Sequence, residues 1–249
     1  MKNNILGIIP ARYDSQRLHG KVLIDIGGQS MVQRVYRQAC QATRLDKVLV
    51  ATDHEGVFEH VKSFGGEAIM TSPAHTSGTD RCAEVARLWG ESYPVVINIQ
   101  GDEPFINPQQ IDQVATLFDQ ADTQIATLAK KIETMEELQD EKEAKIVLNH
   151  QQEVLYMSRS PIPYLRKAPL ADWLLHHTFY KHIGIYGFRA EVLAAIPHLP
   201  SSALEAAEGL EQLRWLGHYR LKVGFTEFET FAIDTEADLA QLDKYLPKS

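Results

Sequence analysis

A short loop near the start of the chain concentrates positive charge. Arg12, Arg17 and Lys21 lie within residues 12–21, where Asp14 is the only acid. A guanidinium group can bind phosphate oxygens in pairs, and a lysine ammonium acts as a mobile point charge. The loop follows an apolar run at residues 5–10, and open α/β sheets bind ligands just beyond the carboxyl ends of such strands. We therefore predict that it binds a polyphosphate. The alternative is an ordinary solvated loop.

Two aspartates far apart in the sequence are candidate metal ligands. Asp102 lies in the stretch QGDEP at residues 100–104, directly after the apolar run 95–99. Asp234 precedes Thr235 and Asp238, which form a capping box for the last helix and so leave Asp234 available. Mg²⁺ takes one or two carboxylates together with waters and substrate phosphates. The two aspartates therefore predict a site for a Mg²⁺-bound nucleoside triphosphate, with a simple turn at QGDEP as the alternative.

A third polar stretch, HTSGTDR at residues 75–81, leads into a predicted helix. Its hydroxyl groups, its glycine and the helix N-terminus could cradle a phosphate or contact a base edge. A plain N-cap at Ser77 or Thr79 explains the same residues equally well, so both interpretations stay open. His176, His177 and His182 lack neighbouring cysteines or closely spaced carboxylates, which disfavours a zinc site. The chain has no GxGxxG and no GxSxG motif, which disfavours a Rossmann dehydrogenase and an α/β-hydrolase.

Composition limits the partners of the chain. With 25 Lys and Arg against 33 Asp and Glu, the net charge of −8 disfavours nucleic acid. Cys40 and Cys82, the only cysteines, lie on apolar helical stripes, so we predict that both are core residues without a disulfide. The N-terminus lacks the pattern of a signal peptide, and no run of about 18 apolar residues occurs, so we predict a cytoplasmic protein without membrane insertion.

The elements that must position these residues alternate between strand and helix. Apolar runs predict strands at 5–10, 47–51, 67–70 and 95–99, and helical stripes predict helices at 31–42, 54–64, 79–89 and from Asn107-Pro108 to 118. Repeated βα units imply a mostly parallel, doubly wound α/β sheet. We expect one domain over residues 1–249.

The second half of the chain departs from this pattern. Strands are predicted at 125–132, 145–148, 153–158 and 181–188, with a proline-bearing stretch at 161–169. We interpret residues 150–200, approximately, as an inserted β-containing wing. Its exposed edges need a cover, so we predict a homodimer formed through the wing, with a loop of the same chain as the alternative cover.

The C-terminal part is predicted to contain a helix at 202–217, strands at 221–225 and 230–233, and a last helix bearing Leu239, Leu242 and Leu246. On the helix at 202–217 we expect one face to point into the core, namely Ala203, Ala206, Ala207, Leu210 and Leu213. The opposite face carries Glu205, Glu208, Glu211 and Gln212. This face is either solvated or provides hydrogen bonds to a polyhydroxy ligand.

Taken together, these motifs closely resemble those of the bacterial 3-deoxy-manno-octulosonate (KDO) cytidylyltransferases, also called CMP-KDO synthetases. The resemblance extends from one end of the chain to the other, with the motifs in the same order and at matching spacing. They are IIPARYDSQRLHGK at 8–21, ATDHE at 51–55, HTSGTDR at 75–81, NIQGDEP at 98–104, YMSRSPIPY at 156–164, KHIGIYGF at 181–188, LEQLR at 210–214 and IDTEADL at 233–239.

The resemblance implies a nucleotidyltransferase of the glycosyltransferase-A-like fold. Such an enzyme couples CTP and KDO to CMP-KDO and pyrophosphate with Mg²⁺, which activates KDO for lipopolysaccharide synthesis. The implied nucleotide-binding residues are Ala11, Arg12, Arg17, Lys21, Ser77, Arg81 and Gln100. Asp102 and Asp234 would hold the metal and, with Arg12 and Lys21, form the catalytic set. Arg159 would meet the sugar carboxylate, and the sugar hydroxyls would contact His182, Tyr186, Glu211 and Gln212.

Two motifs depart from the usual family pattern. His19 and Val22 stand where the loop usually has prolines, so we expect a less rigid loop. Glu236 stands where the family usually has proline after Asp-Thr, which weakens the start of the last helix and leaves Asp234 in place. The same chemistry on an amino-KDO or another 2-keto acid sugar, and a non-catalytic CTP-binding protein, are the alternatives that the sequence leaves open.

Overall fold

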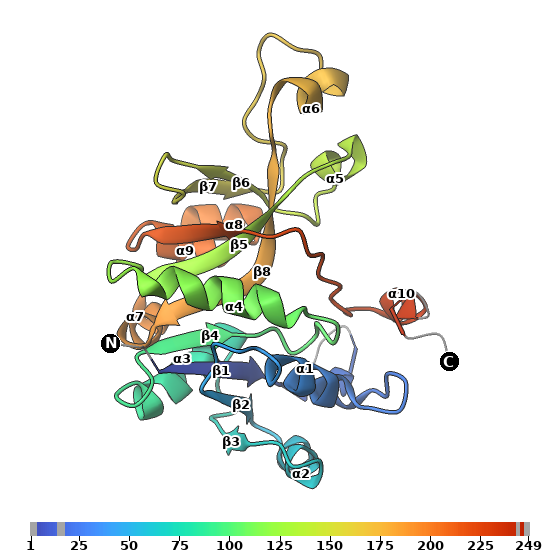
Figure 1. Cartoon of the computed structure of the whole chain (residues 1–249), viewed down its shortest axis with the longest axis vertical. Helices are drawn as coiled ribbons and strands as arrows, with labels where there is room; N and C mark the ends of the chain where they lie inside the picture. The colour runs from blue at the N-terminus through green and yellow to red at the C-terminus, as the bar shows by residue number, and fades with distance from the viewer. Residues whose placement is uncertain (1–3, 14–17, 243–244, 247–249) are drawn as a thin grey trace.

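The chain folds around one mixed β-sheet (Figure 1). The computed structural model describes residues 4–13, 18–242 and 245–246. Within them, the strand order along the sheet is β3-β2-β1-β4-β8-β5-β9, and β6 joins β7 and β8 beside this path. This confirms the predicted α/β fold class.

The first half of the chain forms the parallel part of the sheet. β1 pairs in parallel with β2 and with β4, and β2 pairs in parallel with β3. The strands are β1 (Ile5–Pro10), β2 (Lys47–Thr52), β3 (Ala68–Met70) and β4 (Val95–Asn98), and the helices between and after them are α1 (Met31–Ala39), α2 (Glu55–Ser63), α3 (Gly78–Trp89) and α4 (Pro108–Thr116).

Alternation along β1 builds a core on each face of the sheet. Leu6 and Ile8 belong to the core cluster that includes the buried face of α3, whereas Ile5 and Ile9 belong to the cluster with α1 and α4. All four side chains are almost fully buried. A strand that is buried on both faces has a continuous apolar sequence, which is why β1 and β4 could be predicted from the sequence.

The second half of the chain adds antiparallel strands. β8 (Tyr180–Arg189) lies between β4 and β5 (Ile125–Lys131) and is antiparallel to both, while β9 (Leu221–Phe225) is parallel to β5. β6 (Lys145–Leu148) and β7 (Val154–Ser158), both predicted as strands, form a hairpin. Up to residue 200 the short helices of this half are α5 (Met135–Gln139), α6 (Trp173–His176) and α7 (Ala190–Ala195). 3-10 turns occur at Leu117–Asp119, after α4, and at Leu170–Asp172 and Ile196–His198.

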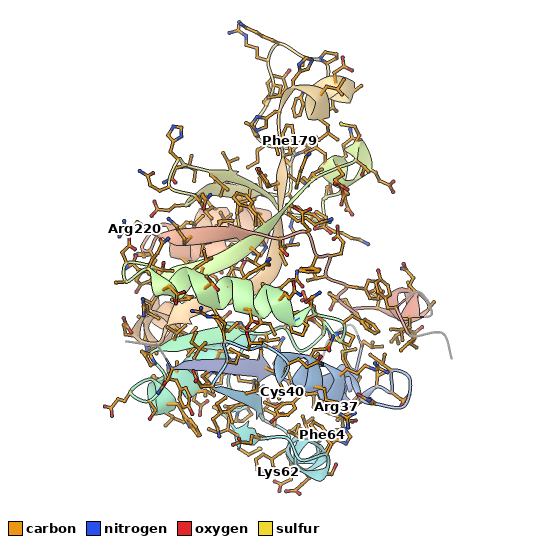
Figure 2. The ribbon with its side chains drawn as sticks, in the orientation of Figure 1. Arg37, Cys40, Lys62, Phe64, Phe179 and Arg220 are labelled. Carbon is orange, nitrogen blue, oxygen red and sulfur yellow. The ribbon has the colours of Figure 1, made fainter. Side chains whose placement is uncertain are left out.

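The segment that carries α6 projects from the sheet (Figure 1). It has a small core of its own, in which Trp173 stacks on Phe179 beside Ile132 and Leu138. Figure 2 labels Phe179 at the base of the projection. Residues 150–200 therefore include this projection and also β8, a central strand. The division of the chain into a domain and a wing stays a prediction.

The predicted helix at 202–217 was wrong in its length and in its orientation. It consists of α8 (Ala203–Glu208) and α9 (Gln212–Leu216), because Gly209 adopts a left-handed conformation (φ 63°) and ends α8. Ala203, Ala206 and Ala207 are exposed, contrary to the prediction, while Leu210 and Leu213 are buried as expected. The carboxylates of α8 turn inward instead, where Glu205 pairs with Arg214 at 3.1 Å.

Two further predictions need correction. Residues 230–233 form no strand but an extended connection to α10 (Glu236–Leu239). Cys82 is buried as predicted, whereas Cys40 is exposed (Figure 2), because α1 ends at Ala39, three residues before the predicted end, and Cys40 is its C-cap. In the part of the chain that the structure describes, no helix combines the length and apolarity needed to span a bilayer.

Gly101 brings the loop after β4 against the end of β1. A Cβ atom at this position would lie 2.6 Å from the carbonyl oxygen of Pro10, closer than real Cβ contacts. We therefore expect Gly101→Ala to lower the free energy of unfolding by roughly 1–3 kcal/mol, because backbone must shift to accept the methyl group. Urea denaturation of the variant and the wild type measures this.

Gly217→Ala is the matched control, since its nearest neighbour would be the carbonyl oxygen of Arg214 at an ordinary 3.7 Å. We expect a change within about 0.5 kcal/mol for it. Equal losses for both variants would contradict the steric explanation.

Candidate active site

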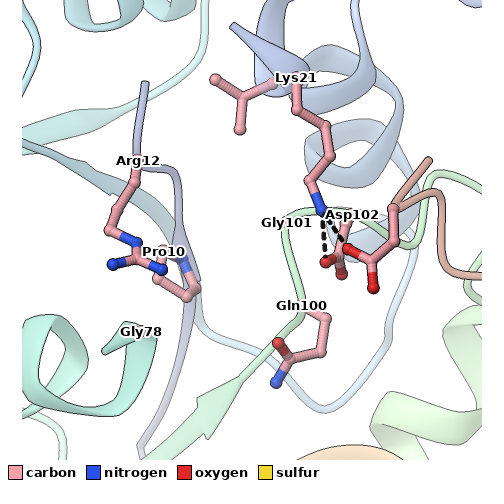
Figure 3. Close-up of a pocket in the computed structure, with 9 residues that line it drawn as sticks. Pro10, Arg12, Lys21, Gly78, Gln100, Gly101 and Asp102 are labelled. Atoms are coloured by element: carbon pink, nitrogen blue, oxygen red, sulfur yellow. Dashed lines mark hydrogen bonds and ion pairs between the residues drawn. The ribbon is translucent and has the colours of Figure 1, made fainter. Parts of the chain in front are cut away.

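The carboxyl ends of β1 and β4 open onto a polar pocket of about 180 Å³ (Figure 3). This is the place where open α/β sheets bind ligands. Its lining comes from segments far apart in the sequence, namely Pro10, Arg12, Lys21, Val22, Gly78, Gln100, Gly101, Asp102 and Asp234. Five residues selected from the sequence therefore share one pocket: Arg12, Lys21, Gln100, Asp102 and Asp234.

Lys21 joins the two aspartates. Its Nζ donates to Oδ2 of Asp102 at 2.9 Å and to Oδ1 of Asp234 at 2.8 Å (Figure 3). The lysine side chain is 10% exposed, against 27% and 31% for the two aspartates. Burial by itself lowers the pKa of Lys21, but the two carboxylates outweigh it, so the pKa lies above its usual value. The ammonium group is therefore charged.

Backbone contacts hold the two aspartates together. The Ile233 N–H donates to the carbonyl oxygen of Asp102 at 2.9 Å, which ties the C-terminal connection to the loop after β4. The Asp234 N–H donates to Oδ2 of Asp238 at 3.0 Å. Thr235 and Asp238 form the predicted capping box at the start of α10.

Glu103 behaves differently from its neighbour Asp102. Its side chain is 5% exposed, and its Oε2 atom is buried without a hydrogen-bond partner. Burial, followed by the charge of Asp102, raises the pKa of Glu103 to about 8. The sequence shows two adjacent carboxylates, but only the fold shows that the second one faces the interior.

Arg12 lies across the pocket from Lys21 (Figure 3). Its Nη1 donates to the carbonyl oxygen of Thr76 at 2.8 Å, so the loop before α3 orients the guanidinium group. That loop is anchored by Glu84, which accepts from the Ser72 N–H at 2.9 Å and contacts His75. Sequence reasoning missed Glu84, because it is one acidic residue within α3 and only its contacts with the loop distinguish it.

Three other implied nucleotide-binding residues, Ala11, Ser77 and Arg81, do not line this pocket. Ser77 caps α3 in a capping box with Asp80. Arg81 is fully buried and pairs with Asp53 at 2.7 Å, and Ala11 is buried at the end of β1. Arg17 lies outside the described residues. Whether Ser77 and Arg81 also contact a nucleotide stays a prediction.

Two of the residues implied for the sugar, His182 and Tyr186, lie on β8. His182 stacks on Tyr186 with a centroid separation of 5.0 Å, and its Nε2 lies 2.9 Å from Oγ1 of Thr127. Glu211 accepts from Oγ1 of Thr79 at 3.0 Å, and burial raises the pKa of the Glu211 carboxyl group. Thr79 belongs to α3, so this contact links α3 to the residues around β8.

Two further residues of this set are held by protein contacts. The buried Gln212 donates to Sδ of Met157 at 3.4 Å. Arg159 donates through Nε to the Glu208 carbonyl oxygen at 2.7 Å and through Nη1 to the Glu141 carbonyl oxygen at 2.8 Å. The guanidinium group of Arg159 is thus fixed by backbone groups.

Comparison with known proteins agrees with this geometry. The model of the cytidylyltransferase family matches residues 6–222. The 3-deoxy-manno-octulosonate cytidylyltransferase of Parabacteroides distasonis is 51% identical over 246 residues, which cover 97% of each chain, and that of Bacteroides thetaiotaomicron is 50% identical with the same coverage. The chain belongs to the 3-deoxy-manno-octulosonate cytidylyltransferase family.

Solved structures support the same family. A CMP:2-keto-3-deoxy-manno-octonic acid synthetase complexed with CTP superimposes with a TM-score of 0.89 at 39% identity, and the match covers 98% of this chain and 100% of the other. The 4-diphosphocytidyl-2C-methyl-D-erythritol synthase of Anaerococcus prevotii has a TM-score of 0.65 at 13% identity, with full coverage of both chains. This second match shows the fold alone.

The carboxylate pair of this cytidylyltransferase fits a divalent cation. The ammonium group of Lys21 already demonstrates that Asp102 and Asp234 converge on one positive charge. Within residues 4–13, 18–242 and 245–246, no cluster of three or more His, Cys, Asp or Glu side chains could hold a metal. Two carboxylates suffice for Mg²⁺ when substrate phosphates and waters complete its coordination.

His182 makes stability depend on pH. Burial lowers the pKa of His182 to about 4 from 6.5, so the unfolded state binds a proton that the folded state excludes between these values. The free energy of unfolding should therefore fall as the pH is lowered from 6.5 to 4, by roughly 1–3 kcal/mol from this group. Urea denaturation at several pH values measures the slope.

We expect His182→Gln to have a shallower slope than the wild type, because it lacks this proton. His150→Gln replaces an exposed histidine and should keep the wild-type slope. Identical slopes for the wild type and His182→Gln would contradict the assignment.

Proposed function

We propose that the chain transfers the cytidylyl group of CTP to 3-deoxy-D-manno-octulosonate, giving CMP-KDO and pyrophosphate. The observation that carries the proposal is the convergence of Asp102, Asp234 and Lys21 at the sheet edge, opposite Arg12. The relatives that are about half identical over nearly the whole chain are named for this reaction. The proposed location is the cytoplasm, because two free cysteines without a disulfide are typical of a reducing compartment.

The proposed reaction is an in-line displacement. The anomeric C2 hydroxyl oxygen of the sugar acid forms a bond to the α-phosphorus of CTP, and the bond from that phosphorus to its bridging oxygen breaks. Pyrophosphate leaves, and the hydroxyl proton is released. Reactions of this kind depend mostly on positioning and on neutralising phosphate charge.

Residues of this chain would provide both the positioning and the neutralisation of phosphate charge. Arg12 is held by the Thr76 carbonyl group and presents its guanidinium to the pocket, where it would bind phosphate oxygens. Lys21 would stabilise charge on the leaving pyrophosphate. Asp102 and Asp234 would hold Mg²⁺, the proposed cofactor. When bound, this ion would neutralise the phosphates and lower the pKa of the attacking hydroxyl.

Loss of one carboxylate tests the site. We expect Asp102→Asn to reduce pyrophosphate release from CTP and KDO by at least about 100-fold at saturating Mg²⁺, because a neutral amide binds the cation far more weakly. Asp122→Asn changes an exposed aspartate in the same way and should retain wild-type rates. Near-normal turnover by a folded Asp102→Asn chain would refute the metal assignment.

Substrate choice is tested with the wild-type chain. Each nucleoside triphosphate is combined with a panel of 2-keto sugar acids, including an amino-KDO, and pyrophosphate release is measured. We expect release with CTP and KDO and little with the other pairs. Binding of CTP without release for any acid would refute the proposed reaction.

The homodimer is proposed from the projecting wing segment. Its tip exposes large apolar side chains, with Tyr164 76% and Leu175 81% exposed. Exposed apolar patches on a projection are characteristic of interfaces between subunits. The partner proposed for this tip is a second copy of the chain.

Leu175→Asp is therefore expected to shift the chain from dimer to monomer, because a buried, unpaired carboxylate opposes association. Sedimentation velocity measures this. Leu88→Asp introduces the same charge at a 65% exposed leucine of α3 and should leave the dimer intact. A monomeric wild type would refute the proposal.

A further inference from the structure

Lys21 occupies one oxygen of each carboxylate that is proposed to hold the metal ion. Its Nζ contacts Oδ2 of Asp102 and Oδ1 of Asp234, from a side chain that is nine-tenths buried. A cation bound by these same oxygens competes directly with the ammonium group. Displacement of the ammonium alone would leave a desolvated positive charge without its carboxylate partners, which is costly.

The opposite side of the pocket offers the ammonium another partner. The pocket extends from Lys21 to Arg12 (Figure 3), and its positive side chains suit a triphosphate. Lys21 begins a short 3-10 turn (Lys21–Leu23) that is fixed by the bond from the Leu23 N–H to the Gly20 carbonyl oxygen at 2.9 Å. The backbone is thus anchored while the flexible four-carbon stem of the side chain can redirect the ammonium.

We propose that Lys21 is an internal counter-ion that is exchanged when substrate binds, so that the divalent cation and the triphosphate enter as a pair. The cation takes the carboxylates of Asp102 and Asp234, and the triphosphate takes the released ammonium group. The inference rests on the proposed function, because it takes a nucleoside triphosphate as the anion.

The exchange couples the two binding events. The metal ion alone must compete with Lys21, and the triphosphate alone would draw Lys21 away from two carboxylates that then repel each other and the phosphates. When both ligands bind, each charged group keeps a partner of opposite sign. Each ligand therefore increases the affinity for the other, as linkage requires.

The test measures Mn²⁺ binding to the nucleotide-free full-length chain, with free Mn²⁺ followed by electron paramagnetic resonance. We expect Lys21→Met to bind Mn²⁺ at least about tenfold more tightly than the wild type, because the competing ammonium is gone. Lys21→Gln should behave in the same way. If both variants fold and neither binds more tightly, the proposal is overturned.

Three control variants separate competition from other effects. Lys21→Arg keeps the positive charge and should bind Mn²⁺ as weakly as the wild type. Lys47→Met removes a lysine at the opposite end of the parallel strands, where it pairs with Glu67, and should change nothing. Adding Asp234→Asn to Lys21→Met should abolish the gain. A tenfold gain in Lys47→Met would overturn the proposal, since net charge would then explain the result.

Crystals of the wild type provide a readout that does not depend on the folding of variants. With Mg²⁺ alone, Nζ of Lys21 should stay on both aspartates, and with Mg²⁺ and CTP it should lie on the triphosphate. Retention of both aspartate contacts in the CTP complex, or their loss with Mg²⁺ alone, would overturn the proposal. The Mn²⁺ titration uses neither CTP nor a sugar acid, so its outcome is distinct from that of the pyrophosphate assay.

Discussion

Charge balance between two carboxylates and one ammonium group determines the architecture of the site. Asp102 and Asp234 approach closely enough to share Nζ of Lys21, and like charges at such a separation repel each other strongly in a partly desolvated pocket. The structure keeps them together with backbone bonds, including that from Ile233 to Asp102. A site that holds two negative charges before any ligand binds attracts a cation. Within the protein, the ammonium group of Lys21 provides that positive charge.

The parts of this arrangement that the sequence predicts are those determined by local burial. β1 and β4 are apolar on both faces, so their positions and the loops beyond them follow from composition alone. Arg12, Lys21 and Asp102 could be selected as site residues because they lie in those loops. Asp234 required a different argument, in which the capping of α10 by Thr235 and Asp238 left one carboxylate unassigned.

The errors occur where tertiary contacts override a local pattern. An alanine stripe on 202–217 predicts a helix with a buried apolar face, yet Gly209 ends α8, and pairing of Glu205 with Arg214 turns the acidic face inward. Residues 230–233 have the composition of a strand, but the chain there runs out to Asp234, where Ile233 bonds to the loop after β4 instead of to a strand. The bond from Ile233 to Asp102 joins distant parts of the chain, which no periodicity encodes, whereas Gly209 and the Glu205–Arg214 pair lie within 202–217 itself and act against its alanine stripe.

The change from parallel to antiparallel pairing explains how two substrates can meet. β8 runs antiparallel to β4, with Tyr186 opposite Asn98 at the end of β4, so the part of β8 that precedes Tyr186 continues past the edge where β4 stops. A Cβ atom on Gly184 would lie 3.5 Å from Oε1 of Glu103, which places this stretch beside the loop that carries Asp102. The reversal carries the stretch of β8 with His182 beyond the end of β4, beside the loop that bears Asp102, so a sugar acid bound to this stretch, as we propose, would lie close to the carboxylate pair.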